Sequence, residues 1–161
     1  MIPRFELLSK KRLFGKSVVM SYSHNRTHEL WRSFMVNRKM ISKSIDSNLF
    51  SIQFYPPIFD WSKFSPSTIF EKWAACEVDD SAIIPEGFNE VVLQEGLYAV
   101  FSYKGSSNRG EEVFKSIFCD WLPSSEYSID DRPHFEILGE KYIQGSNDSE
   151  EEIWIPVKLK S

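Results

Sequence analysis

Residues 96–122, GLYAVFSYKGSSNRGEEVFKSIFCDWL, repeat the layout of residues 15–35, GKSVVMSYSHNRTHELWRSFM. In each copy a glycine opens an apolar run that ends in Ser-Tyr, a polar turn follows, and an amphipathic helix with aromatic residues comes next. Each helix leads into a short apolar strand and then a strand with a tryptophan: FSIQFY (50–55) with KWAACEV (72–78), and HFEIL (134–138) with EIWIPVK (152–158). The chain therefore contains two units of the order strand, helix, strand, strand.

The repeat predicts an α+β fold in a single domain, residues 1–161, built from two pseudo-symmetric half-domains of about residues 1–79 and 88–160. Because neither half can bury a full core alone, we expect them to pack about a pseudo-twofold axis in a largely antiparallel sheet, with a central ligand cleft at their seam. In the second half, residues 88–96 and 97–105 are expected to pair as a hairpin turning at Glu95-Gly96. A helix from about Asn108 to Leu122 is expected to follow.

Composition excludes several classes of function. Of the 161 residues, 42% are hydrophobic and 15% aromatic, which is enough for one compact core. The net charge of -4, with scattered Lys and Arg, predicts no direct contact with nucleic acid. No apolar run approaches 18 residues, which predicts no membrane contact. Cys76 and Cys119 lie in apolar surroundings without a CxxC partner, a pattern typical of reduced core thiols in a cytoplasmic protein.

Alternation along the two short strands selects the side chains expected at the seam. In HFEIL, Phe135 and Ile137 share one face of the strand and Glu136 lies on the other. If Phe135 and Ile137 pack under the helix, Glu136 points toward the partner half-domain. By the repeat, the strand at 50–55 aims Gln53 and Tyr55 at the same seam.

Aromatic residues complete this candidate site. The tryptophan-bearing strands can supply Trp73 and Trp154, and Phe101 and Tyr103 share one face of the strand 97–104, although which face lines the cleft stays open. A buried carboxylate without a partner is costly, and an aromatic ring face attracts a cation by about 0.5 to 2 kcal/mol. Such a box around Glu136 would suit a hydrophobic cation. The alternative is a solvated Glu136 paired with Lys or Arg.

The segment PPIFDWSKFSPST (56–68) is too rich in Pro and Ser for a regular element, yet it contains Phe59, Trp61 and Phe64. These rings either pack down on the core as a lid or form an exposed binding patch. His24 and His28 have i,i+4 spacing but no nearby third ligand, so we expect no metal site.

The stretch IPEGFNEVVLQEGLYAVFSYKG (84–105), followed by WLPSSEY, RPHFEIL and EEIWIPVK, resembles the GyrI-like effector-binding family, which includes the ligand-binding domains of the regulators Rob and BmrR. The resemblance covers most of residues 1–160 and is strongest in the second half. It implies two strand-helix-strand-strand units around a cleft, in which an acidic residue of the penultimate strand meets the positive charge of the ligand. Glu136 occupies that position.

The resemblance implies a stand-alone, multidrug-like binding module related to the ligand domains of AraC-type bacterial transcription regulators, without a cofactor. Its predicted ligand is a small, bulky, apolar and cationic molecule. The predicted ligand-binding residues are Glu136, Gln53, Tyr55, Trp73, Phe101, Tyr103 and Trp154. Some family members hydrolyse cyclopropanoid alkylating compounds, which would make Glu136 catalytic, and another acts on DNA gyrase. Both alternatives stay open, as does a regulator as the protein partner.

Overall fold

The computed structural model describes residues 1–106 and 109–161. Its strands are β1 (Arg4–Leu8), β2 (Lys11–Met20), β3 (Leu49–Phe54), β4 (Phe70–Glu77), β5 (Asn89–Leu93), β6 (Gly96–Lys104), β7 (Tyr127–Ile129), β8 (His134–Leu138) and β9 (Glu150–Leu159). The α-helices are α1 (Thr27–Asn37), α2 (Gly110–Lys115) and α3 (Leu122–Ser124), and the π-helical segment η4 (Ser116–Trp121) joins α2 to α3. Two short 3-10 turns are η1 (Arg38–Met40) and η2 (Trp61–Lys63).

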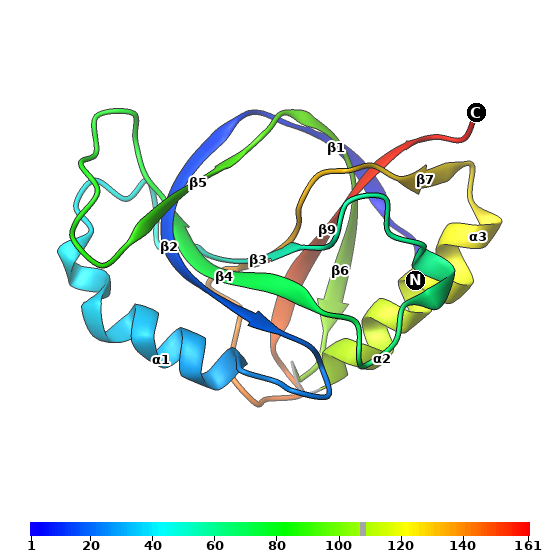
Figure 1. The fold of residues 1–161 in the computed structure, drawn as a ribbon, viewed down its shortest axis with the longest axis horizontal. Helices are drawn as coiled ribbons and strands as arrows, with labels where there is room; N and C mark the ends of the chain where they lie inside the picture. The colour runs from blue at the N-terminus through cyan, green and yellow to red at the C-terminus, as the bar shows by residue number, and fades with distance from the viewer. Residues whose placement is uncertain (107–108) are drawn as a thin grey trace.

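The strands form one antiparallel sheet in the order β1-β6-β9-β8-β3-β4-β2-β5, with β7 paired to β9. The two predicted units are present as β2-α1-β3-β4 and β6-α2-β8-β9, and they meet where β3 pairs with β8 (Figure 1). The predicted α+β fold, with two pseudo-symmetric units in an antiparallel sheet, is therefore confirmed.

The strand register places the pseudo-twofold axis at this seam. Trp73 of β4 lies opposite Ile52, Trp154 of β9 lies opposite Phe135, and Ile52 and Phe135 lie opposite each other. Both indole N–H groups donate to the carboxylate two residues earlier in the same strand, at 2.5 Å from Trp73 and 3.2 Å from Trp154. The repeat in the sequence is therefore also a repeat in hydrogen bonding.

Each unit receives one strand that precedes the other unit. β1 pairs with β6, and β5 pairs with β2 rather than with the adjacent β6, so the predicted hairpin at Glu95-Gly96 is wrong. Both edges of β6 are already occupied by β1 and β9. Glycine at position 96 is explained by the close approach of Arg132 and not by a hairpin turn. A Cβ at Gly96 would lie 2.3 Å from a guanidinium nitrogen of Arg132.

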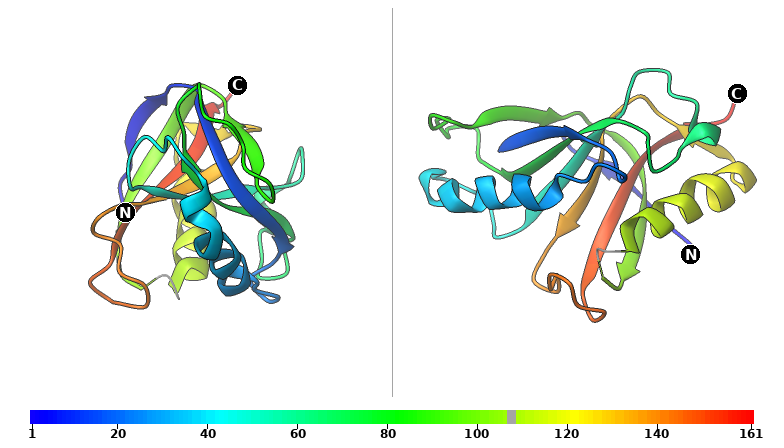
Figure 2. Two further views of the ribbon diagram at one scale, coloured as in Figure 1. Left: turned by 90° about the vertical axis from the view of Figure 1, so that its left-hand side faces the viewer. Right: turned by 60° about the horizontal axis from the view of Figure 1, so that its bottom comes forward.

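The helices cover one face of the sheet and stand apart on it (Figures 1 and 2). α1 buries Leu30 and Phe34 against β2 and β4, and the helix that begins with α2 packs on β6 and β9. The face without helices curves around a third cluster that joins both ends of the sheet: Leu8, Leu13, Phe50, Ile52, Trp73, Ala75, Val91, Leu93, Tyr98, Val100, Phe135 and Trp154.

The expected packing of Phe135 and Ile137 under a helix is wrong. Both belong to the helix-free face, where the Phe135 ring stacks on Trp154 at 5.2 Å between centroids. The curved sheet buries this face without a helix, which sequence periodicity does not reveal. Because strand neighbours alternate, Glu136 lies on the helix-bearing face, in the space between α1 and α2.

The second helix begins at Gly110 in the structure, and the start expected at about Asn108 lies outside the described residues. Pro123 lies within the last turn, α3, rather than directly beyond the helix. Cys76 is a buried free thiol, whereas Cys119 is exposed, so its expected place in the core is wrong. Within the described part of the chain, no helix is both long and apolar enough to span a membrane.

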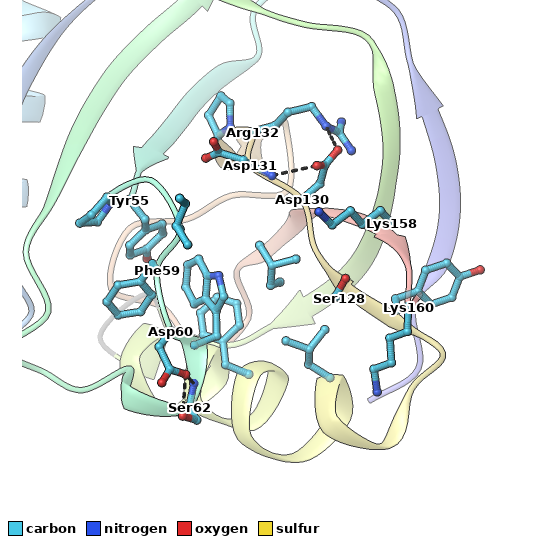
Figure 3. A pocket seen from close by; sticks show the side chains of 18 of the residues that line it. Tyr55, Phe59, Asp60, Ser62, Ser128, Asp130, Asp131, Arg132, Lys158 and Lys160 are labelled. Carbon is cyan, nitrogen blue, oxygen red and sulfur yellow. Dashed lines mark hydrogen bonds and ion pairs between the residues drawn. The ribbon is translucent and has the colours of Figure 1, made fainter.

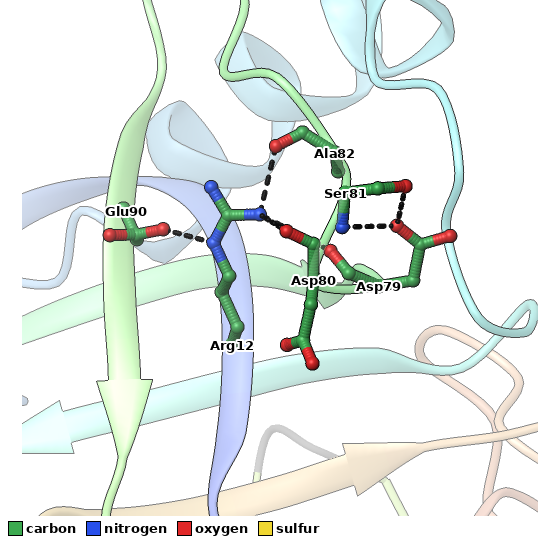
Figure 4. A network of polar contacts seen from close by, with 6 residues as sticks. All are labelled: Arg12, Asp79, Asp80, Ser81, Ala82 and Glu90. Atoms are coloured by element: carbon green, nitrogen blue, oxygen red, sulfur yellow. Dashed lines mark hydrogen bonds and ion pairs between the residues drawn. The ribbon is translucent and has the colours of Figure 1, made fainter.

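Arg12 fixes the connection between the two units to β2 (Figure 4). Its Nε donates to the Glu90 carboxylate on β5, and its Nη1 donates to the carbonyl of Ala82 at 2.8 Å. Asp79 accepts from both the backbone N–H and the hydroxyl of Ser81, at 2.9 and 2.8 Å. These bonds hold β5 and the preceding loop against the first unit.

Candidate ligand-binding cleft

A cavity of about 960 Å³ opens between α1 and α2 on the helix-bearing face of the sheet. Its floor comes from five adjacent strands, with Lys72 on β4, Ser51 on β3, Glu136 on β8, Glu151 on β9 and Tyr103 on β6. Cavities that bind drug-sized ligands have volumes of roughly 300 to 1,000 Å³. The cavity is therefore large enough for a bulky small molecule.

Aromatic and apolar side chains form the walls on both sides. Trp31 and Met35 of α1 line one wall, Val113 and Phe114 of α2 line the other, and Tyr22 lies at one end. Trp31 and Phe114 each contact the core and also line the cavity.

Glu136 is the most buried carboxylate on the cavity floor, with 9% of the residue exposed. Gln53 Nε2 donates to its Oε2 at 3.1 Å, across the pseudo-twofold seam. Burial raises the pKa of Glu136, and the opposing effects come from the Lys72 charge and from hydrogen bonds with Gln53 and Ser51. The carboxylate is thus held in place from one side, and its other side faces the cavity.

Two charged neighbours of Glu136 were not identified in the sequence. Lys72 donates to Thr27 Oγ1 at the start of α1, at 3.1 Å, and burial lowers its pKa against the opposing charges of Glu136 and Glu151. Burial and the charge of Glu136 raise the pKa of Glu151 to about 8. Strand alternation would have found Lys72, because it precedes Trp73 and must face the other side of the sheet.

The structure brings only part of the predicted residue set to the cavity. Glu136 and Tyr103 line it, and Gln53 lies directly behind Glu136. Phe101 shares the face of Tyr103 but is fully buried under the second helix, with its ring 5.1 Å from that of Trp121. The face of β6 that carries Phe101 and Tyr103 is therefore the one that lines the cleft, and only its end at Tyr103 reaches the cavity.

Trp73 and Trp154 do not reach the cavity. Their side chains lie in the cluster on the helix-free face, with Phe135 between the two strands that carry them. Placing them beside Glu136 was wrong because Trp73 lies opposite Ile52 and Trp154 lies opposite Phe135, and residues opposite each other in neighbouring strands point to the same face.

Tyr55 lies at the edge of a different cavity, and its ring contacts Trp61 at 4.7 Å and His134 at 5.0 Å between centroids. Its hydroxyl and His134 Nδ1 are buried without a hydrogen-bond partner among residues 1–106 and 109–161. Burial lowers the pKa of His134 to about 3, so its imidazole is neutral at physiological pH. These groups form a neutral support next to Gln53 rather than part of the cavity wall.

This second cavity, of about 740 Å³, lies between the 56–64 loop and the segment from α3 to Arg132 (Figure 3). Phe59 and Trp61 pack down on the core, which was one of the two expectations for this loop. The centroid of the Trp61 ring lies 4.5 Å from that of Phe118. At its rim Asp130 pairs with Arg132 at 2.8 Å and Lys160 donates to the Ser125 carbonyl at 2.6 Å, while Arg132 Nη1 is buried without a hydrogen-bond partner among residues 1–106 and 109–161. We take the larger cavity as the candidate site because it has the buried Glu136 carboxylate on its floor.

Within the described ranges, no group of three or more His, Cys, Asp or Glu side chains is arranged to hold a metal ion. The polar groups of the larger cavity are three carboxylates, one ammonium, one guanidinium, one imidazole, hydroxyls and amides, and the remaining lining is mainly aromatic or aliphatic. Such a lining can enclose an apolar molecule and meet a single charge at the floor.

Comparison with known proteins agrees with this geometry. The model of the GyrI-like small-molecule-binding domain matches residues 1–158. No protein with a curated function shows significant sequence similarity to the chain.

Several solved structures share the fold at low identity. SAV2435 bound to tetraphenylphosphonium is 17% identical with a TM-score of 0.70, and the alignment covers 98% of this chain and 94% of that one. The C-terminal domain of EcmrR is 13% identical with a TM-score of 0.68, over 99% and 100% of the two chains. A hydrolase from Listeria innocua is 10% identical with a TM-score of 0.61, over 98% and 92%.

Proposed function

The chain belongs to the GyrI-like family of small-molecule-binding domains, and from this premise we propose that its cleft takes bulky, apolar, cationic compounds whose charge is met by Glu136. The observation that carries the proposal is a buried carboxylate on the floor of a 960 Å³ cavity with aromatic walls. SAV2435, which shares the fold, has been seen with the lipophilic cation tetraphenylphosphonium. That likeness supports the ligand class proposed here.

Electrostatics favours a cation over a neutral ligand of the same shape. Burial of an unpaired carboxylate costs free energy, which an arriving cation offsets if its own apolar shell has already reduced its hydration. The faces of Trp31 and Phe114 add roughly 0.5 to 2 kcal/mol each if they meet the charge. A compact, strongly hydrated cation such as Na⁺ gains neither effect, so bulky organic cations are the expected class.

Lys72 limits the strength of this attraction. With Glu136 and Glu151 ionised and Lys72 protonated, these three floor groups carry a net charge of -1. The ammonium is held toward α1 by Thr27, whereas Glu136 and Glu151 lie on neighbouring strands toward α2. A cation is therefore expected to sit nearer the two carboxylates than the lysine.

Titration with tetraphenylphosphonium, followed by calorimetry and by quenching of tryptophan fluorescence, tests the proposal. Glu136→Gln keeps the shape and removes the charge, so we expect at least a tenfold loss of affinity, or about 1.4 kcal/mol, with little change for neutral triphenylphosphine oxide. The matched control is Glu152→Gln, on the next strand but facing the other side of the sheet beside Trp154. Equal affinity of wild type and Glu136→Gln for the cation would refute the role of Glu136.

A hydrolase of cyclopropanoid alkylating compounds is the second candidate, favoured by one observation. Glu151 supplies a second carboxyl group close to Glu136 with a pKa of about 8, so one group could accept a proton while the other donates one. Turnover of a cyclopropane-bearing alkylator by the wild type, lost in Glu136→Gln, would establish this activity. Stoichiometric binding without product would leave the protein as a binder.

A further inference from the structure

Glu151 and Glu136 form an acid pair on the cavity floor. In the antiparallel register Glu136 lies opposite Ile153, so Glu151, two residues earlier on β9, points to the same face and is the diagonal neighbour of Glu136. Diagonal neighbours in a sheet are roughly 7 to 8 Å apart at Cα, which long side chains can bridge. Both carboxyl groups line the cavity, one on each side of the β8–β9 ladder.

The charges around this pair do not balance when both acids are ionised. Lys72 on β4 is the ammonium that acts on both carboxyl groups in the described residues. Arg32 and His28 of α1 line the exposed mouth, where water screens them, and Arg32 donates to the His28 ring. Glu111 of α2, also at the cavity, adds a further negative charge.

The remaining titratable groups that face the cavity are phenols: Tyr22, Tyr103 and Tyr142 in its lining and Tyr55 behind it. Burial raises the pKa of Tyr22, Tyr55 and Tyr103, so these three stay neutral near pH 7. None of them neutralises the second carboxylate. In the empty cleft, the uncompensated negative charge is removed at least cost by one proton on the acid pair.

We propose that Glu151 is a second specificity-determining residue of the cleft, and that Glu136 and Glu151 share one proton which leaves for solvent when a cation binds. The proposal rests on the proposed function and adds a cation–proton exchange to it. The bound cation replaces the proton, so the net charge of the floor is the same before and after binding. A neutral ligand gives no reason for the proton to leave.

The shared proton resides mainly on Glu151. Glu136 accepts a hydrogen bond from Gln53 at 3.1 Å, which favours its ionised form, whereas no donor to the Glu151 carboxylate is recorded among the described residues. The raised pKa of Glu151, about 8, agrees with this assignment. Protonation then competes with cation binding, and affinity for a permanent cation should tighten about tenfold per pH unit from pH 6 to pH 7 and level off above pH 8.

Isothermal titration with tetraphenylphosphonium at pH 7, in phosphate and in Tris, measures the number of protons released. The expected result is close to one proton per cation for the wild type and for Glu152→Gln, and close to none for Glu151→Gln. The affinity of Glu151→Gln should not vary between pH 6 and pH 8.5. It should be weaker than that of the wild type at pH 8.5, and the difference should narrow as the pH falls to 6. Triphenylphosphine oxide should release no proton from any variant.

Binding of the cation without proton release refutes the exchange and leaves the proposed function intact. Release that persists in Glu151→Gln but disappears in Lys72→Met identifies the lysine as the source and also overturns the assignment. Failure of the wild type to bind tetraphenylphosphonium refutes the proposed function, and the exchange with it. Thermal unfolding of each variant verifies that it is folded before titration.

Discussion

Glu151→Gln should change the pH dependence of stability in a defined direction. The folded-state pKa of Glu151 is about 8, above the reference value of 4.5, because burial and the charge of Glu136 disfavour its ionised form. The folded protein therefore holds a proton that the unfolded chain has lost, and this contribution to stability is complete below pH 4.5. As pH rises toward 8, this contribution to the free energy of unfolding must fall.

The difference between 4.5 and about 8 corresponds to at most ~5 kcal/mol, because each pH unit contributes about 1.4 kcal/mol. Glu151 is only partly buried, so we expect the realised loss to be about 2 to 3 kcal/mol between pH 5 and pH 8.5. Asp60, Asp79 and Asp130 have lowered pKa values, and the stability they add with rising pH is already present by pH 5. His134, whose pKa is lowered from 6.5 to about 3, adds stability as the pH rises to 6.5, but it does so equally in the wild type and in Glu151→Gln. The difference between the two pH profiles therefore isolates Glu151.

Chemical unfolding by urea, followed by tryptophan fluorescence at half-unit steps of pH, gives the required free energies. Glu151→Gln should match the wild type near pH 5 and exceed it in stability by about 2 kcal/mol at pH 8.5, with an unchanged urea dependence. Glu152→Gln, whose carboxylate faces the other side of the sheet, should follow the wild-type pH profile. Parallel profiles for the wild type and Glu151→Gln would show that Glu151 titrates normally, contrary to the reasoning above.

Three further predictions follow from the packing and charges. Lys72→Met removes a like charge, so affinity for tetraphenylphosphonium at pH 8 should rise about tenfold in calorimetric titration, and unchanged affinity would contradict the charge balance. Gly15→Ala places a Cβ 2.2 Å from a backbone oxygen of β4 and should cost at least ~2 kcal/mol in urea unfolding, whereas Gly110→Ala, with open space around it, should cost nothing. Trp154→Ala should lower the free energy of unfolding by about 3 to 5 kcal/mol, but at low temperature, where the variant is folded, its affinity for tetraphenylphosphonium should change little. Trp31→Ala should weaken that affinity severalfold. The reverse pattern would place the ligand on the other face of the sheet.

Much of the architecture could be predicted because the sequence repeat indicates two units with the same order of strand, helix, strand and strand. The glycine, Ser-Tyr and tryptophan positions recur in the same order, and the pairing of Ile52 with Phe135 shows that this order reflects a real axis. The pairing of β5 with β2 could not be predicted, since nearness in sequence favours a hairpin with β6 and only the three-dimensional arrangement shows that both edges of β6 are taken.

The candidate site was predicted in part, for a similar reason. Alternation placed Glu136 and Gln53 on one face correctly, but it does not state which face the helices cover. The register between neighbouring strands, which the sequence does not give, pairs Trp73 with Ile52 and Trp154 with Phe135. Both tryptophans therefore lie on the other face, and Lys72 and Glu151 line the cavity in their place. The available signal was the polar residues in the tryptophan-bearing strands. A charged side chain on the strand face away from a buried indole must either reach solvent or line a cavity.

β1 and β5 each pair with a strand of the other unit, and this exchange determines when a nascent chain can complete its fold on the ribosome. β1 is synthesised first, yet its partner β6 follows almost a hundred residues later, and β9, at the end of the chain, fills the place between β6 and β8. Until β6 has been synthesised β1 presents unpaired backbone groups that other chains can join, and the outer edge of β2 does so until β5 has been synthesised. Chaperone protection of the emerging first half should therefore matter more for this protein than for one whose halves mature separately.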